Sequence, residues 1–207
     1  MACYLEVVDL TKLPPAQTVL SLQEQAYYQT LRVPKRRSEW LGGRLALKRL
    51  AASTLCVSDW TQLEILPHAS GKPQLCISGQ PVAAAYSITH SHGVAVAGLS
   101  TDDRFLGIDL EKIEPRISAW ANDFFQPDEL TSTTDDFLTA LWTQKEALVK
   151  LLGVGLALRS SEVCCVKGIP RFSGRALRIY ESLGKPVITL KTEPWPGGFM
   201  FSVASGK

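Results

Sequence analysis

The most regular hydrophobic pattern of the chain runs from Phe137 to Gly155. Its large apolar residues recur at spacings of four and seven, so they share one face of a predicted helix, and that face is assigned to the core. The members of this face are Phe137, Leu141, Leu148 and Leu152. Trp142, Glu146 and Lys150 form a neighbouring stripe at i, i+4 and i+8. This stripe is the first candidate for chemistry, and an ordinary helical ion pair between Glu146 and Lys150 is the alternative.

The rest of the pattern predicts further helices and strands on both sides of this helix. Before it we expect helices at 19–31 and 34–55, and strands at 3–10, 82–89, 94–99 and 106–113. After it we expect four strands between Gly and Pro turns, at 162–167, 177–183, 187–192 and 199–204. The helix can be capped by Thr134, Asp135 or Asp136 and can end at Gly153 or Gly155.

Both halves of the chain therefore run from a strand through helices to several strands, with a seam at 101–104. This order predicts an α+β fold of two similar α+β lobes with a pseudo-twofold relation, residues 1–103 and 104–207. No residue-level repeat is visible in the sequence. Because a cleft between lobes is the usual place for a ligand, we expect the active site there.

The composition of the chain mainly excludes some classes of protein. The 207 residues are 45% hydrophobic and 20% charged, and the net charge of +2 is too small to indicate a nucleic-acid partner. No apolar run approaches the ~20 residues that span a bilayer, and the N-terminus is acidic, so we expect no membrane association and a cytoplasmic location. The five cysteines form no C-x-x-C pair, which argues against a zinc knuckle or a disulfide framework.

A local anion site is expected on the helix at 34–55, which carries the densest basic cluster. Arg37 and Arg44 are seven residues apart and lie on nearly one face. Arg36 lies at the helix start, where backbone N–H groups also point toward anions. Solvated surface arginines are the alternative.

Two turns add further polar side chains. In the turn at 68–73, Pro73 holds Lys72 in an extended conformation, so Lys72 projects from a fixed loop. His90 and His92 lie at the tip of a predicted hairpin. A metal site there lacks a third nitrogen or sulfur ligand, which leaves a polar turn or a phosphate contact as alternatives.

The predicted strand at 106–113 carries two carboxylates. Alternate residues of a strand face the same way, so Asp109 and Glu111 point to one side, about 7 Å apart. Without a cation they repel each other, which a surface strand tolerates. Mg²⁺ would fit between them, because this ion takes a few carboxylates and leaves its other positions for water and substrate phosphates.

Four motifs occur in an order typical of one enzyme family. They lie at 71–73 (GKP), 87–91 (SITHS), 107–111 (GIDLE) and 142–150 (WTQKEALVK). Together they resemble the two-lobed, Sfp-type 4′-phosphopantetheinyl transferases, and the chain length fits this class better than the half-length trimeric class. The resemblance implies a Mg²⁺-dependent holo-[acyl-carrier-protein] synthase. Such an enzyme transfers 4′-phosphopantetheine from coenzyme A to a serine of an apo acyl or peptidyl carrier protein and releases 3′,5′-adenosine bisphosphate.

The resemblance also implies roles for single residues. Asp109, Glu111 and Glu146 match the acidic positions that hold Mg²⁺, with Mn²⁺ as a substitute, against the pyrophosphate of coenzyme A. Seven residues match positions near the coenzyme A phosphates or the reacting centre: Arg36, Arg44, Lys72, Thr89, His90, Lys145 and Lys150. Helix geometry alone favours Arg37 over Arg36 as the 3′-phosphate contact. Thr89 stands where the family has serine and keeps a hydroxyl.

The implied reaction suggests catalytic roles. A carrier serine attacks the β-phosphate, so negative charge develops on nonbridging and departing oxygens, which Mg²⁺, Lys145 and Lys150 would stabilise. Glu146 would remove the serine proton, directly or through a metal-bound water. The sequence does not distinguish its role as a metal ligand from its role as a base. A further acidic position of the family matches either Asp128 or Glu129.

Two other functions fit parts of the pattern. A Mg²⁺-dependent, nuclease-like hydrolase also needs clustered carboxylates and a lysine, but the modest net charge and the lack of an aromatic and basic groove argue against it. A non-catalytic module that binds carrier proteins need not keep Asp109, Glu111, Glu146 and Lys150 together. We therefore expect a monomeric enzyme that serves fatty acid, polyketide or nonribosomal peptide carriers, and the sequence does not indicate which.

Overall fold

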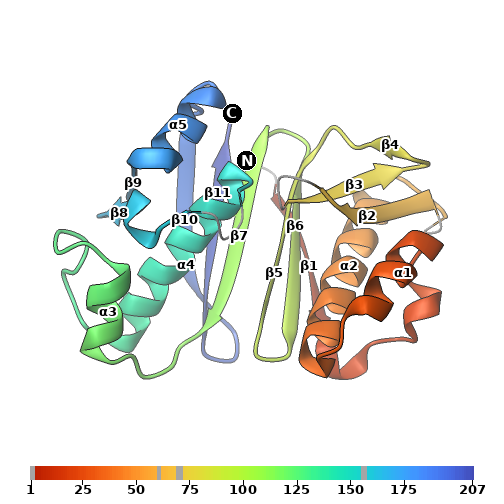
Figure 1. The fold of residues 1–207 in the computed structure, drawn as a ribbon, viewed down its shortest axis with the longest axis horizontal. Helices are drawn as coiled ribbons and strands as arrows, with labels where there is room; N and C mark the ends of the chain where they lie inside the picture. Colours follow the sequence, from red (N-terminus) through yellow and green to blue (C-terminus); the bar gives the residue numbers. More distant parts are fainter. Residues whose placement is uncertain (1–2, 60–61, 69–71, 155–157) are drawn as a thin grey trace. The chain divides into compact units, whose positions relative to one another are not determined.

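The computed structural model describes residues 3–59, 62–68, 72–154 and 158–207. The chain divides into two compact units, unit 1 (residues 1–102) and unit 2 (residues 103–207). In each unit one long helix packs on a three-stranded antiparallel sheet (Figure 1). The predicted α+β class is therefore confirmed.

The described residues of unit 1 form two sheets and two α-helices. The larger sheet has the spatial order β1 (Cys3–Asp9), β6 (Val94–Ser100) and β5 (Ala85–Ser91). The smaller sheet consists of β2 (Leu63–Pro67), β3 (Pro73–Ile77) and β4 (Gln80–Pro81). The helices are α1 (Leu22–Thr30) and α2 (Pro34–Thr54), and α2 packs on the larger sheet.

Unit 2 also contains two sheets. The larger one has the order β10 (Ile188–Trp195), β11 (Phe199–Gly206) and β7 (Phe105–Lys112). The smaller one pairs β8 (Val163–Val166) with β9 (Ile169–Phe172). The helices are α3 (Ser118–Phe124), α4 (Asp135–Leu152) and α5 (Gly174–Ser182). The helix α4 packs on the larger sheet and ends at Gly153, whose φ of 74° is left-handed, as a glycine C-cap predicts.

The two units share one connectivity. In each, the first strand (β1 or β7) pairs antiparallel with the second strand of a later hairpin (β5–β6 or β10–β11). The long helix follows the first strand, and a small antiparallel sheet lies in sequence between that helix and the hairpin. The prediction of two similar α+β lobes is confirmed at the level of topology. The pseudo-twofold axis and the cleft stay predictions.

Some predicted elements differ from the structure. The segment 177–183, expected as a strand, lies mostly in α5, because apolar residues three to four apart pack against Ala176 and the core on one helix face. The strands β2, β3, β4 and β9 were not predicted. His90 lies within β5, and the hairpin turn consists of His92 and Gly93, both with positive φ. Gly71 and Gly155 lie outside the described residues.

No helix in the described part of the chain combines the length and apolar character needed to cross a bilayer.

Gly107 allows α4 to lie directly against the backbone of β7. A Cβ at this position would overlap the carbonyl oxygen of Ala147 and lie 2.5 Å from the amide nitrogen of Leu151. Both are backbone atoms, so they cannot rotate away. We expect Gly107→Ala to lower the free energy of unfolding by about 2–3 kcal/mol, measured by urea denaturation.

The comparison variant for this prediction is Gly42→Ala. There the added Cβ meets the Cδ2 atom of Leu10, which is the end of a side chain that can rotate. Alanine is also favoured over glycine in a helix by about 1 kcal/mol, so we expect little net change. Equal losses in Gly42→Ala and Gly107→Ala would contradict the close-packing explanation.

Candidate active site

In unit 2, Asp109 on β7 faces Lys150 on α4. The Asp109 Oδ1 atom accepts a 2.7 Å hydrogen bond from Lys150 Nζ, and Asp109 is only 4% exposed. The spacing along the helix predicted an ion pair between Glu146 and Lys150 as the alternative to a catalytic role. The structure instead places the Lys150 ammonium on Asp109, so α4 and β7 are joined by charge as well as by packing.

Glu146 lies half-buried on the same helix, and its carboxyl group has a strongly altered acidity. The pKa of Glu146 is raised to about 7, chiefly by burial and also by repulsion from Asp109 and Glu111, while the Lys150 ammonium opposes these effects. The three predicted acidic residues therefore influence one another. A carboxylate that titrates near neutral pH suits a general base.

The three carboxylates fit a hard cation in chemistry. Asp109, Glu111 and Glu146 offer only oxygen donors, which Mg²⁺ prefers, and a divalent cation would relieve the repulsion that raises the pKa of Glu146. Among the described residues, no three His, Cys, Asp or Glu side chains are placed closely enough to hold a metal ion as they stand. The ligand set thus stays a prediction.

A cavity of about 180 Å³ lies beside Glu146 in unit 2. Its apolar lining residues are Phe124, Trp142, Val149, Leu158 and Val163. Its polar lining residues are Lys145, Glu146, Arg159 and Ser160. The Trp142 ring packs edge-on against the Phe124 ring at a centroid distance of 5.1 Å, which fixes one wall of the cavity.

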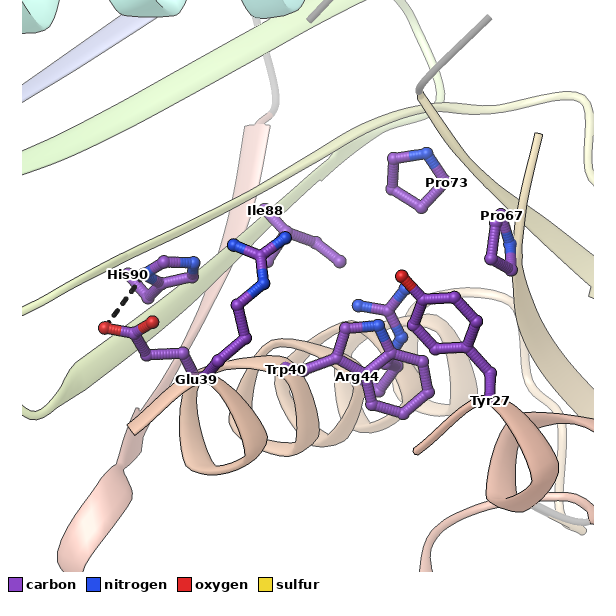
Figure 2. Close-up of a pocket in the computed structure, with 9 residues that line it drawn as sticks. Tyr27, Glu39, Trp40, Arg44, Pro67, Pro73, Ile88 and His90 are labelled. Carbon is purple, nitrogen blue, oxygen red and sulfur yellow. Dashed lines mark ion pairs between the residues drawn. The ribbon is translucent and has the colours of Figure 1, made fainter. Parts of the chain in front are cut away.

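Unit 1 contains a second cavity, of about 320 Å³, in front of α2 (Figure 2). Its lining residues are Tyr27, Arg36, Glu39, Trp40, Arg44, Pro67, Pro73, Ile88 and His90. We call it the anion pocket. The rings of Tyr27 and Trp40 stack with a centroid distance of 5.3 Å, and Figure 2 shows Pro67 and Pro73 across the pocket from α2. The pocket thus combines flat apolar walls with two guanidinium groups.

Arg44 is the most distinctive residue of the anion pocket. It is 9% exposed, and its guanidinium carbon lies 3.6 Å from the centroid of the Trp40 ring. Burial lowers the pKa of Arg44 to about 10, with Glu24 opposing and Arg36 adding to this effect, so Arg44 remains charged at neutral pH. Its Nε is buried and makes no hydrogen bond within the described residues. A buried cation with an unused donor is what an anion site requires.

Comparison with known families identifies part of the chain. The family profile of the 4′-phosphopantetheinyl transferase superfamily matches residues 105–185. We call residues 105–185 the matched region. It includes β7 and α4, and therefore Asp109, Glu111, Glu146 and Lys150.

Relatives in sequence carry the same name. A 4′-phosphopantetheinyl transferase of Synechocystis sp. is 31% identical over 159 residues, which cover 72% of this chain and 63% of the relative. The Bacillus subtilis 4′-phosphopantetheinyl transferase ffp is 32% identical over 95 residues, 42% of this chain and 40% of the relative. The chain thus spans less than two thirds of the length of these relatives. A solved holo-(acyl-carrier-protein) synthase of Bacillus anthracis is 20% identical, with a TM-score of 0.39 over 47% of this chain and 91% of that chain.

Lys145, expected near the phosphates or the reacting centre, has its ammonium group held by internal partners. It is 2% exposed, and its Nζ lies 2.9 Å from Glu129 Oε2. The same Nζ donates to the carbonyl oxygens of Phe124 (2.7 Å) and Ser160 (3.2 Å). An ammonium group has three N–H donors, so these internal acceptors use all of them. Glu129 is therefore the buried acid, whereas Asp128 is exposed and pairs with Arg171.

Three of the residues predicted to contact coenzyme A line the anion pocket: Arg36, Arg44 and His90. Arg37 is not among the lining residues. Its guanidinium carbon lies 4.4 Å from the centroid of the Tyr28 ring. The structure thus favours Arg36 over Arg37 as the second cation of the pocket.

Two other predicted residues lie elsewhere. Thr89 is 3% exposed and alternates with His90 along β5, so it faces the opposite side of the strand. Lys72 Nζ lies 5.3 Å from the centroid of the Tyr86 ring, and burial lowers the pKa of Lys72. Neither side chain lines the anion pocket.

Sequence analysis missed the aromatic and acidic lining of the anion pocket. The spacing of four between Trp40 and Arg44 on a helix could have indicated their cation–π contact. Glu39 Oε1 lies 3.7 Å from His90 Nδ1, the ion pair drawn in Figure 2, and 3.9 Å from Lys35 Nζ. No local signal indicates the pair of Glu39 and His90, because it joins α2 to β5.

Proposed function

We propose that the protein transfers the 4′-phosphopantetheine group of coenzyme A to a serine of an apo carrier protein and releases 3′,5′-adenosine bisphosphate. The observation that carries this proposal is the Asp109–Lys150 pair between β7 and α4, which lies in the matched region together with Glu111 and Glu146. Burial and repulsion from Asp109 and Glu111 raise the pKa of Glu146 to about 7, which supports a role for Glu146 as a base. The names of the relatives support the same reaction. We further propose that the enzyme acts as a cytoplasmic monomer.

The anion pocket supports coenzyme A as the donor. Coenzyme A carries a 3′-phosphate next to a flat purine base. Arg36 and Arg44 provide charge for the phosphate, and the Trp40 ring and the two prolines provide apolar walls for the base.

The residues of unit 2 have different roles in the proposed reaction. The bond from the serine Oγ to the β-phosphorus forms while the bond from that phosphorus to the departing bisphosphate oxygen breaks. Glu146 accepts the serine proton, which its ionised form can do above about pH 7. Lys150, held at Asp109, places a cation beside the carboxylates that would hold Mg²⁺. Bound Mg²⁺ supplies charge neutralisation at the phosphate oxygens.

A transfer assay tests the proposal. The protein is mixed with coenzyme A, Mg²⁺ and apo carriers of the fatty acid, polyketide and nonribosomal peptide types, and each carrier is weighed by mass spectrometry. We expect a phosphopantetheine adduct on the carrier serine and none on a carrier whose serine is replaced by Ala. If the folded protein modifies none of the carriers, the transferase function is wrong.

Arg44 gives a second prediction. Loss of a hydrogen bond to a charged group weakens binding by about 1.5–3 kcal/mol, or roughly 10- to 100-fold. We therefore expect Arg44→Gln to weaken the binding of coenzyme A by this factor in calorimetry. Binding of dephospho-coenzyme A, which lacks the 3′-phosphate, should change much less.

The matched control for this prediction is Arg49→Gln. Arg49 lies on the same helix, is exposed and forms a surface ion pair with Glu6. We expect it to leave both affinities unchanged. Equal weakening of both ligands by Arg44→Gln would show that Arg44 does not contact the 3′-phosphate.

A further inference from the structure

Each unit contains a buried Glu–Lys ion pair of the same construction. In unit 1, Lys48 Nζ on α2 lies 2.5 Å from Glu24 Oε2 and donates to the carbonyl oxygen of Val19 at 2.8 Å. In unit 2, Lys145 Nζ on α4 lies 2.9 Å from Glu129 Oε2 and donates to the carbonyl oxygen of Phe124 at 2.7 Å. In both units the accepting carbonyl precedes the glutamate by five residues.

The carboxylates of Glu24 and Glu129 also accept hydrogen bonds from equivalent backbone N–H groups. In each, Oε2 accepts the backbone N–H of the residue three positions earlier, Ser21 or Gln126, at 2.8 Å. In each, Oε1 accepts a backbone N–H from a strand of the small sheet, Ile65 of β2 at 2.9 Å or Cys165 of β8 at 2.8 Å. The four charged residues are at most 2% exposed. We call these sets the Glu24–Lys48 hub and the Glu129–Lys145 hub.

The Glu24–Lys48 hub lies next to the anion pocket. Lys48 follows Arg44 by one helical turn on α2, and the Glu24 charge acts on the pKa of Arg44. Glu24 lies on α1, which also provides Tyr27 to the pocket lining. The hub therefore fixes α1 and α2 to each other at the point where both meet the pocket.

The Glu129–Lys145 hub lies next to the carboxylate cluster. Lys145 directly precedes Glu146 on α4. The carbonyl groups that Lys145 binds belong to Phe124 and Ser160, which line the cavity beside Glu146. The hub therefore fixes the walls of this cavity to the helix that carries Glu146.

We propose that the two hubs are positioning devices for two separate parts of the reaction proposed above. The Glu24–Lys48 hub holds Arg44 in place for the nucleotide anion, and the Glu129–Lys145 hub holds Glu146 in place for the metal ion and the proton. Apolar contacts alone allow a helix to shift or rotate, whereas a buried ion pair with further hydrogen bonds to the backbone selects one arrangement. In this proposal Lys145 thus has a positioning role, because its ammonium group binds internal acceptors.

Two charge-free double variants test this proposal: Glu24→Gln/Lys48→Met and Glu129→Gln/Lys145→Met. Each removes both charges of one hub, so no unpaired charge stays buried. Two probes are used, 3′,5′-adenosine bisphosphate in calorimetry without metal and Mn²⁺ in electron paramagnetic resonance. We expect the first double variant to weaken bisphosphate binding at least tenfold and Mn²⁺ binding less than twofold. We expect the second double variant to weaken Mn²⁺ binding at least tenfold and bisphosphate binding less than twofold.

The crossed pattern separates positioning from stability, because general destabilisation would affect both probes alike. Equal weakening of both probes, or no change, in either variant would overturn the proposal. If a double variant does not fold, Lys48→Arg or Lys145→Arg replaces it, since a planar guanidinium keeps the charge but changes the hydrogen-bond geometry, and the same crossed pattern is expected.

These binding experiments are independent of catalysis. A chain that shows the crossed pattern but modifies no carrier would refute the proposed function and support the hubs as positioning devices. A wild-type chain that binds neither probe would overturn both proposals.

Discussion

Replacing Glu146 with Gln is expected to slow transfer by orders of magnitude and, at the same time, to make the metal-free protein more stable at pH 8. The activity should fall by about 100- to 10,000-fold, which is the contribution of a positioned general base. An amide cannot accept the serine proton and is a weaker ligand for Mg²⁺ than a carboxylate. The transfer assay measures this loss with coenzyme A and the carrier at saturating concentrations.

The gain in stability follows from the pKa of Glu146. Its value of about 7 in the folded protein lies above the ordinary value of 4.5. Between these two values the folded state binds the proton more tightly than the unfolded state, so the free energy of unfolding falls as the pH rises through this window. The loss is complete above about pH 7 and amounts to at most about 3 kcal/mol. The glutamine side chain of the variant does not ionise, so the free energy of unfolding of the variant does not fall in this way.

Urea denaturation at pH 5 and pH 8 in the presence of EDTA measures the effect. The wild type should lose stability relative to Glu146→Gln between the two pH values. The control is Glu193→Gln, an exposed position on β10 that should change neither activity nor the pH dependence. Full activity of Glu146→Gln would refute the catalytic role, and lower stability than wild type at pH 8 would refute the explanation from burial and repulsion.

Added Mg²⁺ gives an independent view of the same site. A ligand that binds only the folded state raises its stability by mass action. Saturating Mg²⁺ should therefore raise the melting temperature of the wild type and should have a much smaller effect on Glu146→Gln. Equal shifts in both proteins would place the metal away from Glu146.

The long helix α4 was the element that the sequence predicted best. Its apolar period places Leu141, Leu148 and Leu152 in the core, and its glycine C-cap lies where the pattern ends. Such local signals depend only on spacing along the chain. The order of the four motifs indicated the carboxylates of β7 and α4, and in the structure Asp109 and Glu111 both contribute to the raised pKa of Glu146.

Contacts between distant segments could not be predicted in this way. The family resemblance placed Lys145 near the phosphates or the reacting centre, and no local pattern indicated that its side chain is buried. Lysine is almost never fully buried unless it is paired. Its burial depends on Glu129, a partner on another segment of unit 2. The pair of Glu39 and His90 was missed for the same reason.

The internal repeat was invisible in the sequence for a related physical reason. Most contacts of the two hubs use backbone groups, for example the carbonyl oxygens of Val19 and Phe124. A hydrogen bond to a backbone group does not restrict the type of amino acid at that position. Only the glutamate and the lysine of each hub need to keep their identity, and two residues far apart do not form a recognisable repeat.

Replacing Lys48 alone with Met is expected to lower the free energy of unfolding by about 3–5 kcal/mol. The substitution leaves the carboxylate of Glu24, which is fully buried, without its cation, and an uncompensated buried charge has a cost of this size. Since a domain of this size is stable by only about 5–15 kcal/mol, the loss should be evident in urea denaturation and in the melting temperature.

The double variant Glu24→Gln/Lys48→Met is expected to recover most of this stability, because it removes the unpaired charge together with its cause. Lys12→Met is the matched control, since Lys12 forms an exposed ion pair with Asp9 that should contribute less than about 1 kcal/mol. If Lys48→Met costs no more than Lys12→Met, the buried pair does not hold α1 to α2. If the double variant is as unstable as the single one, shape and not charge explains the loss. The expected order therefore identifies paired charge as the interaction that fixes the helix bearing Arg44.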